Sequence, residues 1–217
     1  MKTFQLEGSP REIVGKKAAK ALRKQGLIPA ILYGQEPVQL PFEGVLKNGE
    51  KIVSIGGDKG VIVTDLVVTA ENVRSLIYSP HIYLVELTLE GVGTVKAIIK
   101  DLQFHPVTDV LLHIDFLEVF DGKPIVMEVP VVLEGHAEGV KAGGKLNLEM
   151  RKLRVKASYD KVPEKLTVNV EKLGLGKAIQ IGDLHFEGLE LTNARNSVVC
   201  SVKLTRAARG LEAAKEK

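Results

Sequence analysis

The sequence predicts a mainly β protein with a few short helices, on three observations. Glycine is frequent, at 21 of 217 residues, and valine, isoleucine and leucine outnumber the larger apolar residues, which favours strands joined by many turns. Short stretches alternate apolar and polar residues and end at glycine-containing turns. Apolar residues make up 45% and charged residues 26% of the chain, as in globular proteins with a buried core. This length suits one large domain or two of ordinary size.

In the first half, two segments predict helices and the rest predicts strands and turns. Residues 16–25 are rich in alanine, lysine, leucine and arginine, the best helix formers, and Gly26 supplies a stop. Thr69 suits the N-cap of a second helix over 70–77. Turns are expected at Ser9-Pro10, Asn48-Gly49, 56–58 and Glu90-Gly91. Strands are expected at 3–7, 27–34, near Val45, and at 52–55, 61–63, 82–89, 92–99 and 112–116.

A second β series begins after Phe116, beyond a turn at Asp121-Gly122. Strands are expected at 125–133, 152–157, 166–170, 178–181 and 197–204, joined by glycine-rich turns as in an all-β domain. We therefore expect a first domain at 1–117, a second at 118–205 and a flexible basic tail at 206–217.

Positive charge is concentrated in residues 11–24, which read REIVGKKAAKALRK. The stretch holds six cations and one acid, a net charge of +5, whereas the whole chain carries only +3. On a helical projection the five cations from residue 16 onward fill an arc of roughly 120°, with Ala18, Ala21 and Leu22 on the far side. The cations are Arg11, Lys16, Lys17, Lys20, Arg23 and Lys24.

Two interpretations of this basic face are open, a solvated helix surface and a nucleic-acid contact. A solvated face normally carries glutamates that pair with lysines four residues away, and the helix segment has none. Phosphates would neutralise such a density of cations, each contact releasing a counterion. We favour the nucleic-acid interpretation. An exposed Tyr33 close to this helix would stack on a base or donate to a phosphate; otherwise it is half-buried.

The motif at 112–116 places His113 and Asp115 on one face of a strand. Three interpretations of this pair are open. It is a surface pair without a role, or it is part of a metal or general-base site with His105, Asp101 or Asp109, or it forms hydrogen bonds with RNA. Catalysis or metal binding needs a nucleophile or a third ligand, and no suitable spacing supplies one. We therefore expect no catalytic residue, metal or cofactor.

Other features exclude further classes of protein. The spacing G-x-x-x-x-G-K at 139–145 imitates a phosphate-binding loop, but Leu146 stands where Ser or Thr is required, so it is rejected. The single cysteine, Cys200, permits no internal disulfide and is expected inside a strand. No apolar run has the length of a membrane span, and the N-terminus lacks a signal-peptide core. These features predict a soluble protein of the reducing cytoplasm.

Three segments together resemble a known family. They are REIVGKKAAKALRKQGLIPAILYG near the start, YSPHIY at 78–83 and KDLQFHPVTDVLLHIDF at 100–116. They resemble the twenty-fifth protein of the bacterial large ribosomal subunit, which binds 5S rRNA. In the second half, GVKAGG at 139–144 and VPE at 162–164 are similar to the β domain of the long, two-domain form of that family, the general stress protein CTC type.

The resemblance implies a binding protein and not an enzyme. It implies that the first domain is a β-barrel with a few helices, which docks on loop E of 5S rRNA where the minor groove is widened. It also implies a monomer when free, found on the ribosome in the cytoplasm, with no membrane and no small-molecule substrate. The family's contact positions fall on Arg11, Lys16, Lys20, Arg23, Tyr33, Lys100, His113 and Asp115.

The sequence departs from the family pattern at a few positions. Lys17 stands where members often have glycine, Ala21 where many have arginine, and Lys100 where some have glutamine. The region from 44 to 65 is also longer than usual. Two other functions stay open: a stress-related protein-interaction module without RNA binding, and a hydrolase that uses His105, His113 and Asp115.

Overall fold

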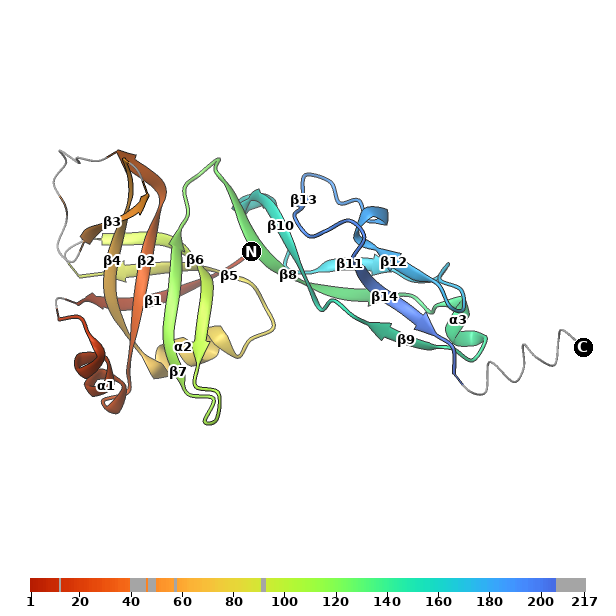
Figure 1. Ribbon diagram of the computed structural model, residues 1–217, viewed down its shortest axis with the longest axis horizontal. Helices are drawn as coiled ribbons and strands as arrows, with labels where there is room; N and C mark the ends of the chain where they lie inside the picture. Colours follow the sequence, from red (N-terminus) through yellow and green to blue (C-terminus); the bar gives the residue numbers. More distant parts are fainter. Residues whose placement is uncertain (12, 40–45, 47–49, 57, 91–92, 206–217) are drawn as a thin grey trace, which may run out of the picture. The chain divides into compact units, whose positions relative to one another are not determined.

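The computed structural model describes residues 1–11, 13–39, 46, 50–56, 58–90 and 93–205 (Figure 1). The chain divides into two compact units, Met1–Lys123 and Pro124–Lys217. A division after residue 117 remains a prediction; it falls at the end of β7 (Leu111–Glu118). The expected strand near Val45, the turn at Asn48-Gly49 and the flexible basic tail lie outside the described residues.

The first unit is a closed barrel of six strands with a seventh strand at its side (Figure 1). The ring runs β1-β5-β6-β7-β2-β4, and β1 pairs with β4 to close it, while β3 pairs only with β4 among the described strands. The other elements of this unit are β1 (Lys2–Pro10), α1 (Lys16–Lys24), β2 (Leu27–Gln39), β3 (Glu50–Gly56), β4 (Lys59–Thr69), α2 (Ala70–Ile77), β5 (Tyr83–Leu89) and β6 (Gly93–Phe104).

Strand β1 closes the barrel by pairing with two partners in succession. Residues 2–8 pair in parallel with β5, and residues 8–10 then pair antiparallel with 66–68 of β4. The turn predicted at Ser9-Pro10 is therefore wrong, because β1 continues through both residues to reach β4. Proline is tolerated here because the pairing with β5 ends at Gly8, which leaves the other edge of β1 unpaired at Pro10.

The barrel interior holds the main apolar core of this unit. Phe116 and Ile114 of β7, Leu66 of β4 and Leu87 of β5 are fully buried in it. Helix α2 adds Val73 and Leu76 to the same cluster, so its apolar side covers part of the core. Along β7 the residues that alternate with these core positions, His113 and Asp115, point to the outer face of the barrel. The core thereby fixes which side chains the outer surface presents.

Both predicted helices of the first unit are confirmed. Helix α1 begins after Gly15, whose φ of +123° favours glycine, and ends before Gly26, whose φ of +76° is left-handed. Helix α2 begins after Thr69 as expected, although the Thr69 side chain makes no capping hydrogen bond. Strand β4 runs to Thr69 and is much longer than the predicted piece at 61–63.

The second unit consists of two small sheets, in agreement with the predicted second β domain. One sheet has the order β11-β8-β10-β13 and the other β12-β14-β9. Cys200 of β14 is fully buried, and this burial raises the pKa of its thiol. The elements are β8 (Pro124–Glu134), α3 (Glu138–Lys141), β9 (Lys145–Leu148), β10 (Lys152–Ser158), η1 (Tyr159–Lys161), β11 (Leu166–Asn169), β12 (Ala178–Gln180), η2 (Ile181–Asp183), β13 (Glu190–Leu191) and β14 (Val198–Lys203).

The segment at 139–145 forms the end of α3, a turn and the start of β9. A Cβ on Gly139 would lie 2.7 Å from the carbonyl carbon of Gly174. Gly139 therefore allows the segment to pack closely against the backbone at Gly174. In the part of the chain that the structure describes, no helix is long and apolar enough to cross a membrane.

Candidate nucleic-acid interface

The four lysines of α1 are exposed, and no carboxylate among the described residues neutralises them. Lys16, Lys17, Lys20 and Lys24 are all exposed, and the first turn of the helix contains no acid. None of these four lysines forms an ion pair with a carboxylate in the described ranges. Arg23 and Lys24 lie in the last turn, where positive charge stabilises the helix dipole. The helix therefore presents its charge outward.

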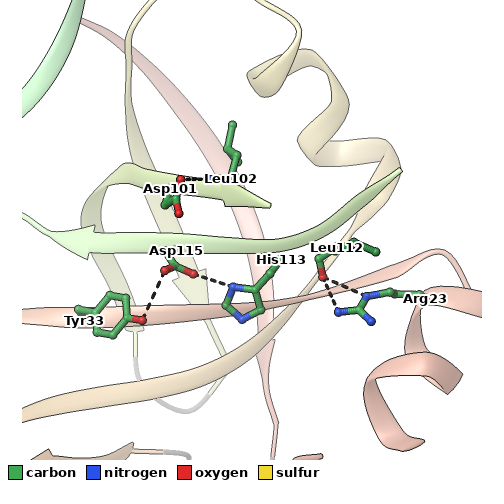
Figure 2. Close-up of polar contacts among 7 residues, drawn as sticks. All are labelled: Arg23, Tyr33, Asp101, Leu102, Leu112, His113 and Asp115. Carbon is green, nitrogen blue, oxygen red and sulfur yellow. Dashed lines mark hydrogen bonds and ion pairs between the residues drawn. The ribbon is translucent and has the colours of Figure 1, made fainter. Parts of the chain in front are cut away.

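Arg23 ties this helix to the barrel. Its Nε and Nη2 atoms donate hydrogen bonds of 3.0 and 2.8 Å to the carbonyl oxygen of Leu112 in β7 (Figure 2). Helix α1 has no buried side chain of its own, so this contact supplies anchoring that apolar packing does not. A second tie joins the helix end to α2, because the Ala70 amide donates to the Gly26 carbonyl at 2.9 Å.

Next to Leu112, three polar side chains form a connected row on the outer face of β7 and β2. His113 Nδ1 lies 2.6 Å from Asp115 Oδ1, and the Tyr33 hydroxyl donates to Asp115 Oδ2 at 3.4 Å (Figure 2). The parallel pairing of β2 with β7 brings these residues together. His113 and Asp115 are only 17% and 18% exposed, so the carboxylate is largely held by its two protein partners.

The Asp115 carboxylate also determines which ring nitrogen of His113 carries the proton in the neutral imidazole. A carboxylate only accepts hydrogen bonds, so the proton of the neutral imidazole resides on Nδ1 and Nε2 is left as an acceptor. The pKa of Tyr33 is raised above its ordinary value of 10.0 by burial, then by the charge and hydrogen bond of Asp115, and last by the charge of Asp65. Tyr33 therefore remains a neutral donor at physiological pH.

The amino-acid sequence matches two families of ribosomal protein. Residues 6–65 and 46–116 match the Ribosomal L25p family, and residues 124–206 match the C-terminal domain of ribosomal protein TL5. The chain is 60% identical over 216 residues to the large ribosomal subunit protein bL25 of Porphyromonas gingivalis, with 100% of both chains covered. It is 59% identical over 218 residues to the protein of that name from Parabacteroides distasonis, covering 98% of this chain and 99% of the other.

The chain belongs to the bL25 family of bacterial large-subunit ribosomal proteins, in its long form. The resemblance drawn from the three sequence segments is thereby confirmed, together with the mainly β architecture of a barrel followed by a second β domain. The RNA-contact role of the individual residues stays a prediction, and the structure reports only where each one lies.

Asp65 is a buried charge of this bL25-family chain that the sequence interpretation missed. It is 4% exposed, and its carboxylate pairs with Lys51 of β3. Its backbone oxygen accepts a hydrogen bond of 2.8 Å from the amide of Arg11. The signal in the sequence was an aspartate inside the apolar stretch VIVTDLVV, since a buried carboxylate requires a partner.

Of the remaining predicted site residues, Arg11 follows β1 and Lys100 lies in β6, the strand that pairs with β7. Arg11 is half-buried; its Nε has no hydrogen-bond partner in the described part of the chain. Lys100 is exposed at a register shift of β6 between Ile99 and Asp101, and such irregularities redirect side chains. Asp101, opposite Asp115, accepts from the Leu102 amide at 2.9 Å.

The described residues contain no cluster of three or more potential metal ligands.

We expect Asp115→Asn to lower the pKa of Tyr33 partway toward 10.0, because the charge of Asp115 is lost while burial remains. Near-ultraviolet absorbance titration, with Tyr33→Phe to assign the signal, measures this change. Since the folded pKa is raised, the stability due to neutral Tyr33 is complete below pH 10.0 and is lost as pH rises through the folded pKa. Asp101→Asn is the matched control; an equal effect of both variants would contradict the assignment.

Proposed function

We propose that this chain binds the loop E region of 5S rRNA. As a bL25 family member it is a structural protein of the large ribosomal subunit and not an enzyme. The observation that carries the proposal is the junction at Arg23, where a helix of exposed lysines meets a strand of polar side chains. Charge for the phosphates and hydrogen-bonding groups for the groove thereby lie on adjoining elements, as recognition of a folded RNA requires.

In this proposal, the lysines of α1 contact the RNA phosphates. Lys16, Lys17, Lys20 and Lys24 are exposed along one helix and carry no described acidic partner, so binding breaks no ion pair there. Each lysine that meets a phosphate releases a counterion from the RNA, which favours association and makes it sensitive to salt. Arg23 contributes charge as well. Its hydrogen bonds to Leu112 occupy only two of its five N–H groups, so the others remain available to a phosphate.

In this proposal, the row of His113, Asp115 and Tyr33 on β7 and β2 contacts the minor groove. In the neutral ring His113 offers Nε2 as an acceptor, so its partner in RNA is a donor, such as a 2′-hydroxyl or the exocyclic amine of guanine. Both groups line the minor groove. Asp115 fixes the tautomer, and Tyr33 holds the second carboxylate oxygen. This arrangement distinguishes the widened minor groove of loop E from an ordinary duplex by shape and by hydrogen bonding.

The partners proposed on this basis are 5S rRNA and the large ribosomal subunit, with the free protein a monomer. Its place is then the ribosome in the bacterial cytoplasm. A stress-related protein-interaction module without RNA binding is not favoured, because it gives no role to the α1 lysines, which have no acidic partner in the described part of the chain. That alternative expects no salt-sensitive association with 5S rRNA.

The affinity for a 5S rRNA fragment containing loop E should fall with salt at a log–log slope of about −3 to −5 if four to five phosphates are neutralised. Lys20→Ala should weaken binding and flatten the slope by roughly one. Fluorescence anisotropy across a salt series measures both. Lys156→Ala is the matched control, since that lysine pairs with Glu190 in the second unit. A slope near zero for the unaltered chain would refute the proposal.

Asp115→Ala should reduce the preference for loop E over plain duplex by about 1–3 kcal/mol, the range of one good base-edge contact. The reason is that the carboxylate no longer holds the tautomer of His113. Competition binding with the two RNAs at fixed salt gives this difference, and Asp101→Ala controls for loss of a nearby charge. An unchanged preference in Asp115→Ala would remove this residue from the recognition set.

A further inference from the structure

A concave site lies beside the basic helix. It is a pocket of about 290 Å³ between the end of α1, the end of α2 and the tip of the β6–β7 hairpin. Its apolar lining includes Ile28, Ile77 and Leu111. Arg23, the residue that anchors α1, also lines it, so the pocket is continuous with the proposed RNA-binding surface. The volume lies at the lower end of small-ligand pockets, which suits one planar group and not a folded segment.

The α2 side of the pocket carries a cation and an aromatic ring. Arg74 lies in the last turn of α2 and is exposed, and Tyr78, the C-cap of that helix, is 68% exposed. The Tyr78 amide donates to the Arg74 carbonyl at 3.1 Å, which places the two residues on one helical turn. Arg74 forms no ion pair with a described carboxylate. Arginine beside an exposed aromatic ring is the combination that holds an unstacked base and its phosphate.

The opposite wall is a preorganised hairpin tip. The His105 amide donates to the Val110 carbonyl at 2.8 Å, and the Asp109 amide donates to the His105 carbonyl at 2.9 Å. The His105 Nδ1 atom accepts from the amides of Val107 and Thr108 at 3.4 and 3.3 Å. These contacts hold Asp109 at a φ of +51°, the one non-glycine residue with positive φ in the described ranges. Such strain is often kept where a side chain must be presented in a fixed place.

We propose that this pocket receives one unstacked base of the bound RNA. The ring of Tyr78 stacks on the base, Arg74 and Arg23 neutralise the flanking phosphates, and the Asp109 carboxylate accepts from an exocyclic amine. This inference rests on the proposed function, since it assigns a further contact to the same RNA. A peptide segment is the competing occupant, but two arginines match a polyanion better when they adjoin lysines that have no partner among the described carboxylates.

The chain contains no tryptophan, so Tyr78→Trp places a single fluorescent reporter at the pocket. On addition of the loop E fragment, we expect its emission to be quenched at the same midpoint as the anisotropy of labelled RNA. Phe120→Trp is the control: Phe120 is 38% exposed in the same unit but does not line the pocket. Its emission should stay unchanged.

Affinity provides the second measurement. Tyr78→Ala should weaken RNA binding by roughly 5- to 100-fold, as expected for the loss of one base stacked on an aromatic ring, whereas Tyr78→Phe should bind normally. Arg74→Ala should weaken binding and flatten the salt slope by about one.

The outcomes separate this inference from the proposed function. If RNA binds with normal affinity to Tyr78→Ala and leaves the emission of Tyr78→Trp unchanged, the pocket holds no base and the inference is overturned, while the proposed function stands. If the unaltered chain shows no binding to the RNA, both fail together.

Discussion

The hydrogen bonds from the Arg23 guanidinium to the Leu112 carbonyl are the constraint on which the proposed surface depends. Helix α1 buries no side chain, and Ala18, Ala21 and Leu22 line an open groove beside β1 and β4 instead of entering the barrel core. A hydrogen bond from a charged group contributes about 1.5–3 kcal/mol, which is considerable for so short a helix. Because Leu112 directly precedes His113, the same contact sets the distance between the lysines proposed to bind phosphates and the strand proposed to contact the groove.

The distribution of ion pairs explains why this surface, and not another, is suited to a polyanion. In the second unit Lys156 pairs with Glu190 at 3.4 Å and Lys203 with Glu149 at 3.3 Å. On the barrel, Lys51 neutralises Asp65, and Asp115 is shared by Tyr33 and His113. These two carboxylates of the barrel are thus held by partners within the protein. The lysines of α1 have no such partner in the described residues, so they concentrate positive charge on this helix.

Local patterns predicted much of the fold, whereas contacts distant in sequence were beyond them. Helix α1 was predicted because strong helix formers precede Gly26, whose left-handed φ ends it. Strand β4 was underestimated because Thr64 and Asp65 interrupt its apolar residues, although both are buried. Closure of the barrel needs Ser9 and Pro10 to pair with β4, and a Ser-Pro pair locally resembles a turn. For the site, the residue types and the strand face on which they lie were predictable from the sequence. The hydrogen bonds between Arg23 and Leu112 were not, because they join residues 89 positions apart and leave no local signal.

The most direct test of the central claim is chemical-shift mapping of the full chain titrated with a loop E fragment of 5S rRNA. If the helix and strand act as one surface, signals from residues 16–26 and 111–117 should shift together, at the same RNA concentration. Signals that shift only in the second unit, or in α1 without β7, would contradict the account.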